Sequence, residues 1–113
     1  MRKVQIEYEW WLAVLEIADN ESTLSMMRDQ LLFWTNGQER IRNSNGDIEL
    51  AYLRMIGREL MLNSMEFNIK GVLEHFKGLE GYAPLDGSHG VKLLSVDSWQ
   101  FEECDFYIRK IET

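Results

Sequence analysis

The sequence predicts a single α+β domain in which strands from both ends of the chain form one antiparallel sheet and three central helices cover it. Three observations support this prediction. Apolar and polar side chains alternate at the N-terminus, apolar side chains recur at helical spacing in the middle, and a glycine-rich stretch precedes further alternation near the C-terminus. With no internal repeat, low-complexity tract or linker, residues 1–113 are expected to fold as one domain with the order β-β-α-α-α-β-β.

The N-terminal segment has the period-2 pattern of a strand with one buried face. Apolar and polar residues alternate from Val4 to Trp10. The pattern breaks at Trp11, and a second apolar run continues to Ile17. Because no Gly, Pro or Asn marks a turn, we expect either a turn or bulge near Trp11 followed by a second strand, or one long bent strand. Successive strand residues point to opposite faces, so at least one of Trp10 and Trp11 should lie outside the main core unless a bulge reorients it.

Three helices are expected in the middle of the chain. Apolar residues recur there with spacings of three and four, which places them on one helix face. The pair Asn36-Gly37 weakens the first helix, which should kink or fray there. Asp47 is placed to cap the second helix, after a tight connection at Asn45-Gly46. The expected helices cover residues 24–45, 48–64 and 68–79.

The C-terminal third begins as a loop and ends in strand-like segments. Four glycines and the only proline fall between Gly78 and Gly90, a composition typical of loops. A strand is expected over Val91–Val96 and another over residues 105–112, where apolar and polar side chains alternate again. Since a lone hairpin is marginally stable in water, the strands of the two ends should pair in one sheet.

The formal net charge of −7 is concentrated at the two ends of the chain. Residues 1–21 hold five acids and two bases, residues 97–113 hold five and two, and residues 22–96 hold nine and eight. A sheet made from both ends would therefore carry an acidic surface. Such a surface repels phosphate backbones, so we expect no direct nucleic-acid binding, whereas a basic partner is compatible with it.

Cysteine usage and hydropathy indicate a soluble cytoplasmic protein. Cys104 is the only cysteine, so no intramolecular disulfide can form, which favours a reducing compartment. The N-terminal residues lack the apolar run of a secretory signal, and no stretch approaches the roughly 18 apolar residues that a membrane span needs. We therefore expect no membrane association and a cytoplasmic location.

Several short motifs are distributed over nearly the whole chain. They are Phe33-Trp34, Arg40-Ile41, Asn45-Gly46-Asp47, Gly81-Tyr82-Ala83-Pro84-Leu85-Asp86-Gly87 and Asp105-Phe106-Tyr107-Ile108. Together they resemble an uncharacterised bacterial family that phages and prophages often encode and that is known only as a domain of unknown function. The resemblance implies a protein of a mobile element and supplies no activity, cofactor or catalytic residue.

The loop that contains Asp86, Ser88 and His89 is the candidate ligand-binding site. A histidine beside a carboxylate and a hydroxyl could perform acid–base chemistry, and the adjacent glycines would let a ligand approach the backbone. A catalytic triad, however, is placed by tertiary geometry, which three residues within four positions rarely achieve. We therefore prefer an Asp-Gly turn that leads into the next strand with His89 exposed, and we assign no catalytic residue.

No metal ion or cofactor is expected. The two histidines and the cysteine are far apart in the sequence, and neither a CxxC nor an HExxH pair occurs. No GxGxxG or P-loop motif is present. Arg54 and Arg58 share a helix face, where they are expected to pair with acids such as Glu59 or to lie in solvent rather than to bind phosphate.

The leading hypothesis is a non-enzymatic interaction or accessory protein of a phage or prophage that binds another protein or itself. The acidic ends, the missing catalytic constellation and the tryptophan expected outside the core support it, with Trp10 and Trp11 as candidate interface residues. One alternative is an acidic inhibitor or immunity-type protein for a basic toxin or nucleic-acid enzyme. Another is a small-ligand module or small enzyme that uses the Asp86–His89 loop, and a third is a phage structural or assembly component.

Overall fold

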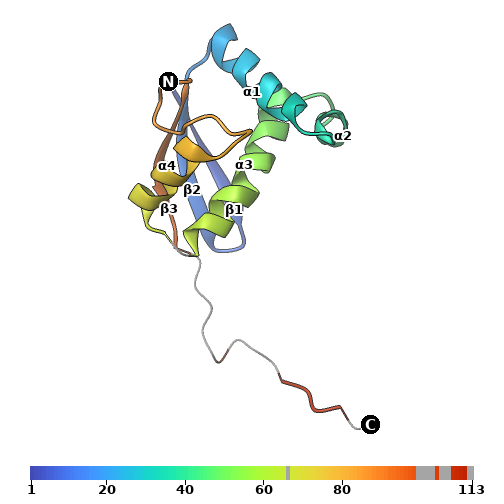
Figure 1. Ribbon diagram of the computed structural model, residues 1–113, viewed down its shortest axis with the longest axis vertical. Coiled ribbons are helices and arrows are strands. Elements are labelled where there is room, and N and C mark those ends of the chain that lie inside the picture. Colours follow the sequence, from blue (N-terminus) through green and yellow to red (C-terminus); the bar gives the residue numbers. More distant parts are fainter. Residues whose placement is uncertain (66, 99–103, 105–107, 112–113) are drawn as a thin grey trace.

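The computed structural model describes residues 1–65, 67–98, 104 and 108–111. They form two layers, an antiparallel sheet and a set of helices on one side of it (Figure 1). The predicted α+β class, with N-terminal strands, central helices and a C-terminal strand, is confirmed. The elements are β1 (Arg2–Tyr8), β2 (Trp11–Ile17), α1 (Glu21–Phe33), α2 (Gly37–Asn43), α3 (Ile48–Ser64), α4 (Ile69–Gly78) and β3 (Val91–Val96).

β1 and β2 form a tight antiparallel hairpin, which decides between the interpretations of the N-terminal segment. Tyr8 pairs with Trp11, so only Glu9 and Trp10 form the turn. Glu9 adopts a φ of 54°, in the left-handed region that the favoured two-residue hairpin turns use at their first position. The sequence does not mark the turn, because a glutamate takes a conformation that usually falls to Gly, Asn or Asp.

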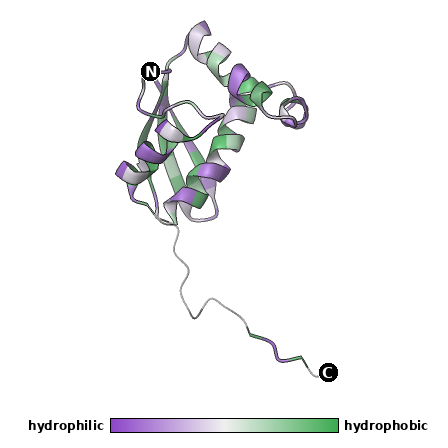
Figure 2. Ribbon diagram, in the orientation of Figure 1, coloured by the Kyte–Doolittle hydropathy of each residue, from purple (hydrophilic) through white to green (hydrophobic). Residues whose placement is uncertain are grey.

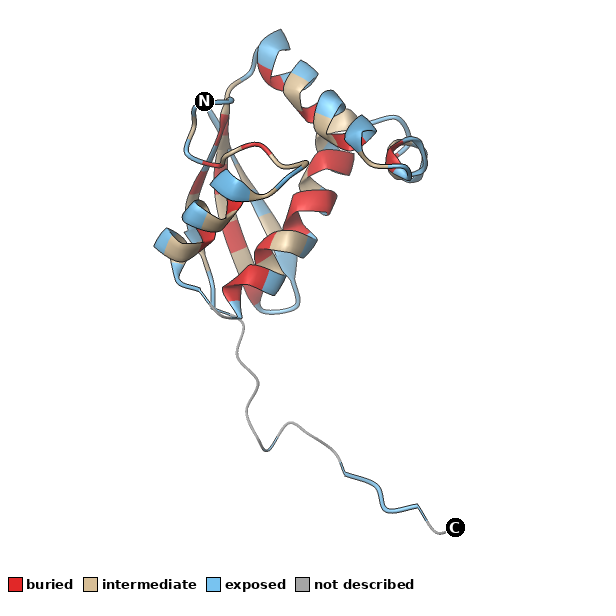
Figure 3. Ribbon diagram, viewed as in Figure 1, coloured by how far each residue is buried: buried red, intermediate tan, exposed pale blue. Residues whose placement is uncertain are grey.

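The sheet has the order β1-β2-β3, with β2 in the centre and β1 at one edge. β2 also pairs antiparallel with β3, and a bulge interrupts the register between Val14 and Leu15. Every second side chain of β2 is buried beneath the helices, and the alternate ones are half-buried on the opposite face (Figure 3). The buried ones are Trp11, Ala13, Leu15 and Ile17.

The helical region contains four helices rather than the predicted three. The first predicted helix is interrupted after Phe33, and a short helix starts at Gly37. The chain folds back so closely that a Cβ atom on Gly37 would overlap the backbone oxygen of Leu31. The expected kink is therefore a full break of the helix, and the close approach requires glycine.

Side-chain caps begin three of the helices. Asn20, Asp47 and Asn68 each accept a hydrogen bond of 2.8–3.0 Å from the backbone N–H three residues further on. The cap expected at Asp47 is thus confirmed. These bonds satisfy donors that a helix leaves unpaired in its first turn.

The helices contribute unequally to the cover of the sheet. α3 packs on β1 and α4 on β3, whereas α1 and α2 pack against α3 (Figure 1). Hydrophobic residues follow the strands and α3 through the middle of the molecule (Figure 2). Trp11 lies in this core, where its Nε1 donates to Ser64 Oγ at 3.2 Å and to the backbone oxygen of Asp97 at 2.9 Å. Among the residues described, no helix has the length and apolar character needed to cross a membrane.

The C-terminal region confirms one of its two predicted strands. β3 coincides with the strand expected over Val91–Val96. Of the strand expected over residues 105–112, positions 105–107 and 112 lie outside the described residues. Residues 108–111 are exposed and form no strand, so the prediction is wrong for them. Alternation alone does not hold a strand, because its backbone groups also need a partner strand.

Candidate functional site

The Asp86–His89 loop brings its three candidate residues into direct contact. The Oδ1 atom of Asp86 accepts hydrogen bonds from the backbone N (3.0 Å) and from Oγ (2.6 Å) of Ser88. Ser88 Oγ also lies 2.9 Å from Nδ1 of His89. All three residues are exposed, as expected for His89.

These contacts are typical of a turn. In a site with an activated serine, the histidine would stand between the serine and the carboxylate. Ser88 lies between Asp86 and His89 and donates its hydroxyl proton to Asp86, so His89 is not positioned to accept that proton. Hydrogen bonds from the hydroxyl and then from the backbone N–H of Ser88 hold the pKa of the Asp86 carboxyl below its usual range. Asp86 is therefore a weak base, in keeping with the Asp-Gly turn that we prefer.

The same loop packs onto β3 and onto the start of α1. The N–H of Gly87 donates to the backbone oxygen of Val91 at 3.0 Å, and a β-bridge joins the loop to Lys92. Gly90 comes so close to Thr23 that a Cβ atom on Gly90 would overlap the threonine hydroxyl. An open recess of about 330 Å³ remains between the loop and α1. The loop therefore covers part of the outer edge of β3.

The hairpin turn separates the two candidate interface tryptophans. Trp10 is 58% exposed at the turn, whereas Trp11 is 1% exposed in the core. The prediction that one of them lies outside the core is confirmed, because the pairing of Tyr8 with Trp11 leaves Trp10 in the turn. Trp11 is not available as a surface contact. Tyr8, the last residue of β1, is also 58% exposed and is the second aromatic side chain at the surface of the hairpin.

The outer edge of β1 presents backbone hydrogen-bonding groups to solvent. Leu12 of β2 accepts a hydrogen bond from the N–H of Asp97 at 2.9 Å, so its backbone groups point toward β3. Because these directions alternate along an antiparallel strand, the alternate residues of β2 bond to β1. The register then turns the backbone groups of Lys3, Gln5 and Glu7 away from β2. In the described part of the chain no strand pairs with this edge.

An apolar groove of about 390 Å³ lies between β1 and α3. Its walls meet where Gly57 faces Ile6, and a Cβ atom on Gly57 would lie 3.0 Å from Ile6 Cγ2. The absence of a side chain at position 57 thus lets the strand and the helix approach closely. The groove is lined by Ile6, Glu7, Tyr8, Trp11, Arg54, Gly57, Arg58, Met61 and Leu62.

A second cavity, of about 220 Å³, adjoins the same arginines on the side of α2. Arg54 and Arg58 lie one helical turn apart on α3, as the sequence predicts, and Arg40 of α2 joins them. None of the three forms an ion pair within the described residues, and Arg54 and Arg58 are exposed, so the second of the two expectations, that they lie in solvent, is the one met. Sequence reasoning missed Arg40 and Tyr82, because only the tertiary fold brings them to α3.

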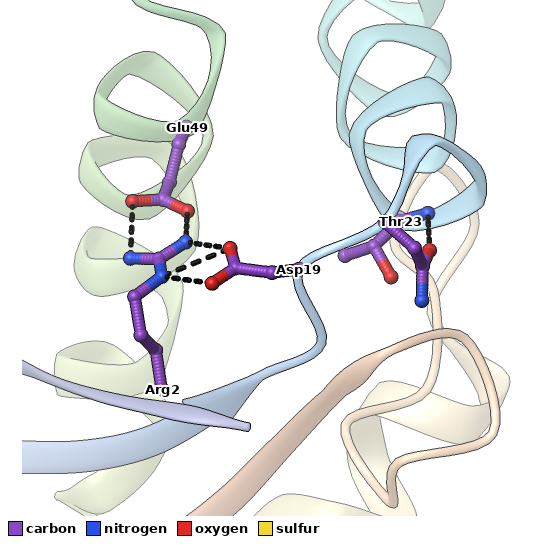
Figure 4. A network of polar contacts seen from close by, with 5 residues as sticks. Arg2, Asp19, Thr23 and Glu49 are labelled. Carbon is purple, nitrogen blue, oxygen red and sulfur yellow. Dashed lines mark hydrogen bonds and ion pairs between the residues drawn. The ribbon is translucent and has the colours of Figure 1, made fainter.

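Arg2, unlike these three arginines, forms ion pairs with two carboxylates. Its guanidinium lies between the carboxylates of Asp19 and Glu49 and donates to both (Figure 4). The Arg2–Asp19 bond is 2.8 Å long. The hydrogen bond from Arg2 lowers the pKa of the Asp19 carboxyl. This contact joins β1, the β2–α1 connection and α3, and its role is structural.

Other chemistry is sparse in the described residues. They contain no group of three His, Cys, Asp or Glu side chains that could hold a metal ion. Cys104 is exposed and is not part of a disulfide.

Comparison with known proteins gives a family and two curated relatives. The family described as "Protein of unknown function (DUF2528)" matches residues 13–108. The chain is 29% identical over 118 residues to "Lambda prophage-derived protein ea10" of Escherichia coli O6:H1 (strain CFT073), with 96% of each chain covered. It is equally similar to "Protein ea10" of Escherichia phage lambda. No solved structure matches.

Proposed function

The chain belongs to the DUF2528 family, and we propose that it is a non-enzymatic phage accessory protein that works by binding protein, first of all a second copy of itself. The family resemblance seen in the sequence is confirmed by the match. The observation that carries the proposal is the outer edge of β1, which no strand of the described residues pairs with and which carries complementary charges. Pairing of this edge with itself would join two three-stranded sheets into one.

The two edges of the sheet differ in a way that favours β1. The loop at Asp86 covers part of β3, whereas nothing in the described residues covers β1. The outward backbone groups of Lys3, Gln5 and Glu7 supply the donors and acceptors that a further strand needs. An exposed edge of this kind is a template for strand addition.

The side chains of β1 match one another across a two-fold axis through Gln5. In that antiparallel register Lys3 lies opposite Glu7 of the second copy, and Val4 lies opposite Ile6 of the second copy. Opposite charges directly across two strands stabilise the pair, and the symmetry repeats each contact. The register therefore combines two charge pairs on one face with two apolar pairs on the other.

The exposed aromatics extend the same surface. Tyr8 falls opposite Arg2 of the second copy, and Trp10 lies just beyond the end of the paired strands. Tyrosine and tryptophan are the residues most often found as energetic anchors of protein interfaces. Trp10 thus keeps the interface role proposed from the sequence, while Trp11 supports the hairpin from inside.

Glu7→Lys tests the proposal directly. The wild-type chain should show concentration-dependent dimers in sedimentation velocity at physiological salt. Glu7→Lys places lysine opposite Lys3 of the second copy twice, and like charges across strands are destabilising. We expect the dissociation constant of the dimer to rise about two- to thirtyfold, since two cross-strand pairs are lost and each contributes about 0.2–1 kcal/mol.

The double variant Lys3→Glu/Glu7→Lys provides the decisive control, because it restores opposite charges in the same register and should recover dimerisation. Glu80→Lys changes the net charge equally at an exposed site away from β1 and should leave the dimer unchanged. A wild-type chain that stays monomeric at all concentrations, or a dimer indifferent to Glu7→Lys, would contradict the proposal.

The geometry of the Asp86 loop supports a non-enzymatic role. Ser88 donates to Asp86, and the carboxylate is a weakened base. The loop also forms backbone hydrogen bonds with the edge of β3. The glycines of the loop are explained by this packing, and no ligand is needed to explain them.

A further inference from the structure

We propose that Arg40, Arg54 and Arg58, together with Tyr82, form a binding site for the phosphate group of a small molecule. The site opens between α2, α3 and the loop that carries Tyr82, and Arg54 and Arg58 also border the groove beside β1. The proposal rests on the position of the arginines, their lack of anionic partners, the hydrogen bonds that hold Arg54, the phenol of Tyr82 and the size of the cavity.

The cavity gathers positive charge in an acidic protein. Three arginines line a cavity of about 220 Å³, and the remaining lining residues are neutral. They are Asn43, Ser44, Ala51, Met55 and Tyr82. The chain as a whole has a net charge of −7, so anions are repelled by most of its surface. An anion that binds here is therefore held by the local cluster rather than by general attraction.

The arginines lack anionic partners. Among the described residues, none of these three arginines forms an ion pair. The Nη1 atom of Arg40 is buried and has no hydrogen-bond acceptor among the residues that the structure describes. A buried N–H without an acceptor is costly, so the guanidinium of Arg40 has unmet hydrogen-bonding capacity beside the cavity.

Neighbouring groups hold the donors in place. Arg54 Nη1 donates to Ser44 Oγ at 3.2 Å and to the backbone oxygen of Asn43 at 3.4 Å. Ser44 is itself buried. These bonds use one nitrogen of the guanidinium and leave others for a ligand. A donor that is already oriented loses less entropy when a ligand binds.

Tyr82 supplies a neutral donor at the same cavity. Its ring packs against Trp34 at 5.7 Å and Phe76 at 5.6 Å between centroids. Burial, followed by the charge of Glu59, raises the pKa of the Tyr82 phenol, so the hydroxyl keeps its proton at neutral pH. A protonated phenol can donate to an oxyanion, as the arginines do.

The chemistry and size of the cavity point to a phosphate group with at most a short substituent. Guanidinium forks match phosphate oxygens in pairs, and the three positive charges more than neutralise a dianion. Cavities for drug-sized ligands span about 300–1,000 Å³, which exceeds the present volume. Free phosphate and the phosphate of a sugar monoester share this chemistry.

Calorimetric titration of the full chain tests the site with two probes, inorganic phosphate and ribose 5-phosphate, at constant ionic strength. We expect saturable binding of at least one. If free phosphate is the ligand it binds more tightly, and if a sugar monoester is the ligand ribose 5-phosphate does. Arg58→Gln should weaken binding at least about tenfold, because a hydrogen bond to a charged group is lost. Arg58 is exposed, so the variant should fold normally.

Arg42→Gln is the matched control. Arg42 lies exposed on α2, two residues from Arg40, and does not line the cavity. The Arg42→Gln substitution removes the same charge as Arg58→Gln and should leave the affinity for both phosphate probes unchanged. Absence of saturable binding of both probes up to about 10 mM, an affinity too weak for a built site, would overturn the proposal. Equal losses in Arg58→Gln and Arg42→Gln would also overturn it, since they would indicate attraction to charge in general.

Discussion

At the scale of single residues, side chains of the same type have opposite roles in this protein. Trp10 and Trp11 are adjacent, yet one is exposed in a turn and the other donates its Nε1 proton inside the core. Arg2 is held by two carboxylates, whereas Arg58 has none in the described residues. In each case the position of the residue in the fold, rather than its type, decides which groups surround it.

The left-handed conformation of Glu9 leads to a prediction at this scale. A non-glycine residue pays about 1–2 kcal/mol for a left-handed backbone, part of which glycine recovers. Glu9→Gly should therefore raise the free energy of unfolding by about 0.5–1 kcal/mol in urea denaturation. Glu16→Gly, in the extended backbone of β2, should instead lower it. The strain argument fails if both variants lower it.

At the scale of elements, the break between α1 and α2 shows how packing overrides a helical pattern. Apolar spacing continues from α1 through Trp34, but Trp34 itself has an extended backbone at the end of α1. Gly37 then starts α2 against the backbone of Leu31. The turn brings Arg40 and Trp34 to the side of α3, where the phosphate site is proposed.

Gly37→Ala tests this break. In an open helix position alanine stabilises by about 1 kcal/mol relative to glycine. Here the added Cβ atom overlaps Leu31, so we expect a loss of about 1–3 kcal/mol in the free energy of unfolding. Gly78→Ala is the matched control, because a Cβ atom on Gly78 meets nothing within 4 Å and should stabilise α4. Stabilisation by both variants would show that the α1–α2 reversal is loose.

At the scale of the whole molecule, Arg2 connects parts that lie far apart in the sequence. It joins β1 to Asp19, before α1, and to Glu49 in the first turn of α3 (Figure 4). The acidic N-terminal region is thus partly neutralised where these elements meet. The exposed acids Glu7 and Glu9 remain on the hairpin.

The Asp19–Arg2 contact predicts a pH dependence of stability. The pKa of Asp19 is depressed in the folded chain, so its stabilising contribution is present above the unfolded pKa of about 3.9 and is lost as the pH falls through the folded pKa. Arg2→Gln should be less stable than wild type at pH 7, and the difference should shrink below about pH 4. Urea denaturation at several pH values measures it, with Arg42→Gln as control. A difference that stays constant with pH would contradict the linkage.

The residues of the Asp86–His89 loop can be predicted from the sequence more easily than those of the arginine site. Asp86, Ser88 and His89 are close in sequence, and the turn that joins them follows from an Asp-Gly pair. Arg54 and Arg58 were also visible as neighbours on one helix face. Arg40 and Tyr82 come from other elements, and no local pattern connects positions so distant in the chain.

The sequence by itself determined the α+β class, the span of β3, the span of α3 and its cap at Asp47, and it left open whether the N-terminal strand segment is a hairpin. These follow from local rules, since alternation, helical spacing and capping each act over a few neighbouring residues. Only the tertiary structure decided that Trp10 is exposed, that the first helix breaks at Gly37 and that no strand of the described residues pairs with the outer edge of β1. Those outcomes depend on which segments approach one another, and close packing between distant parts of the chain, not local preference, selects among them.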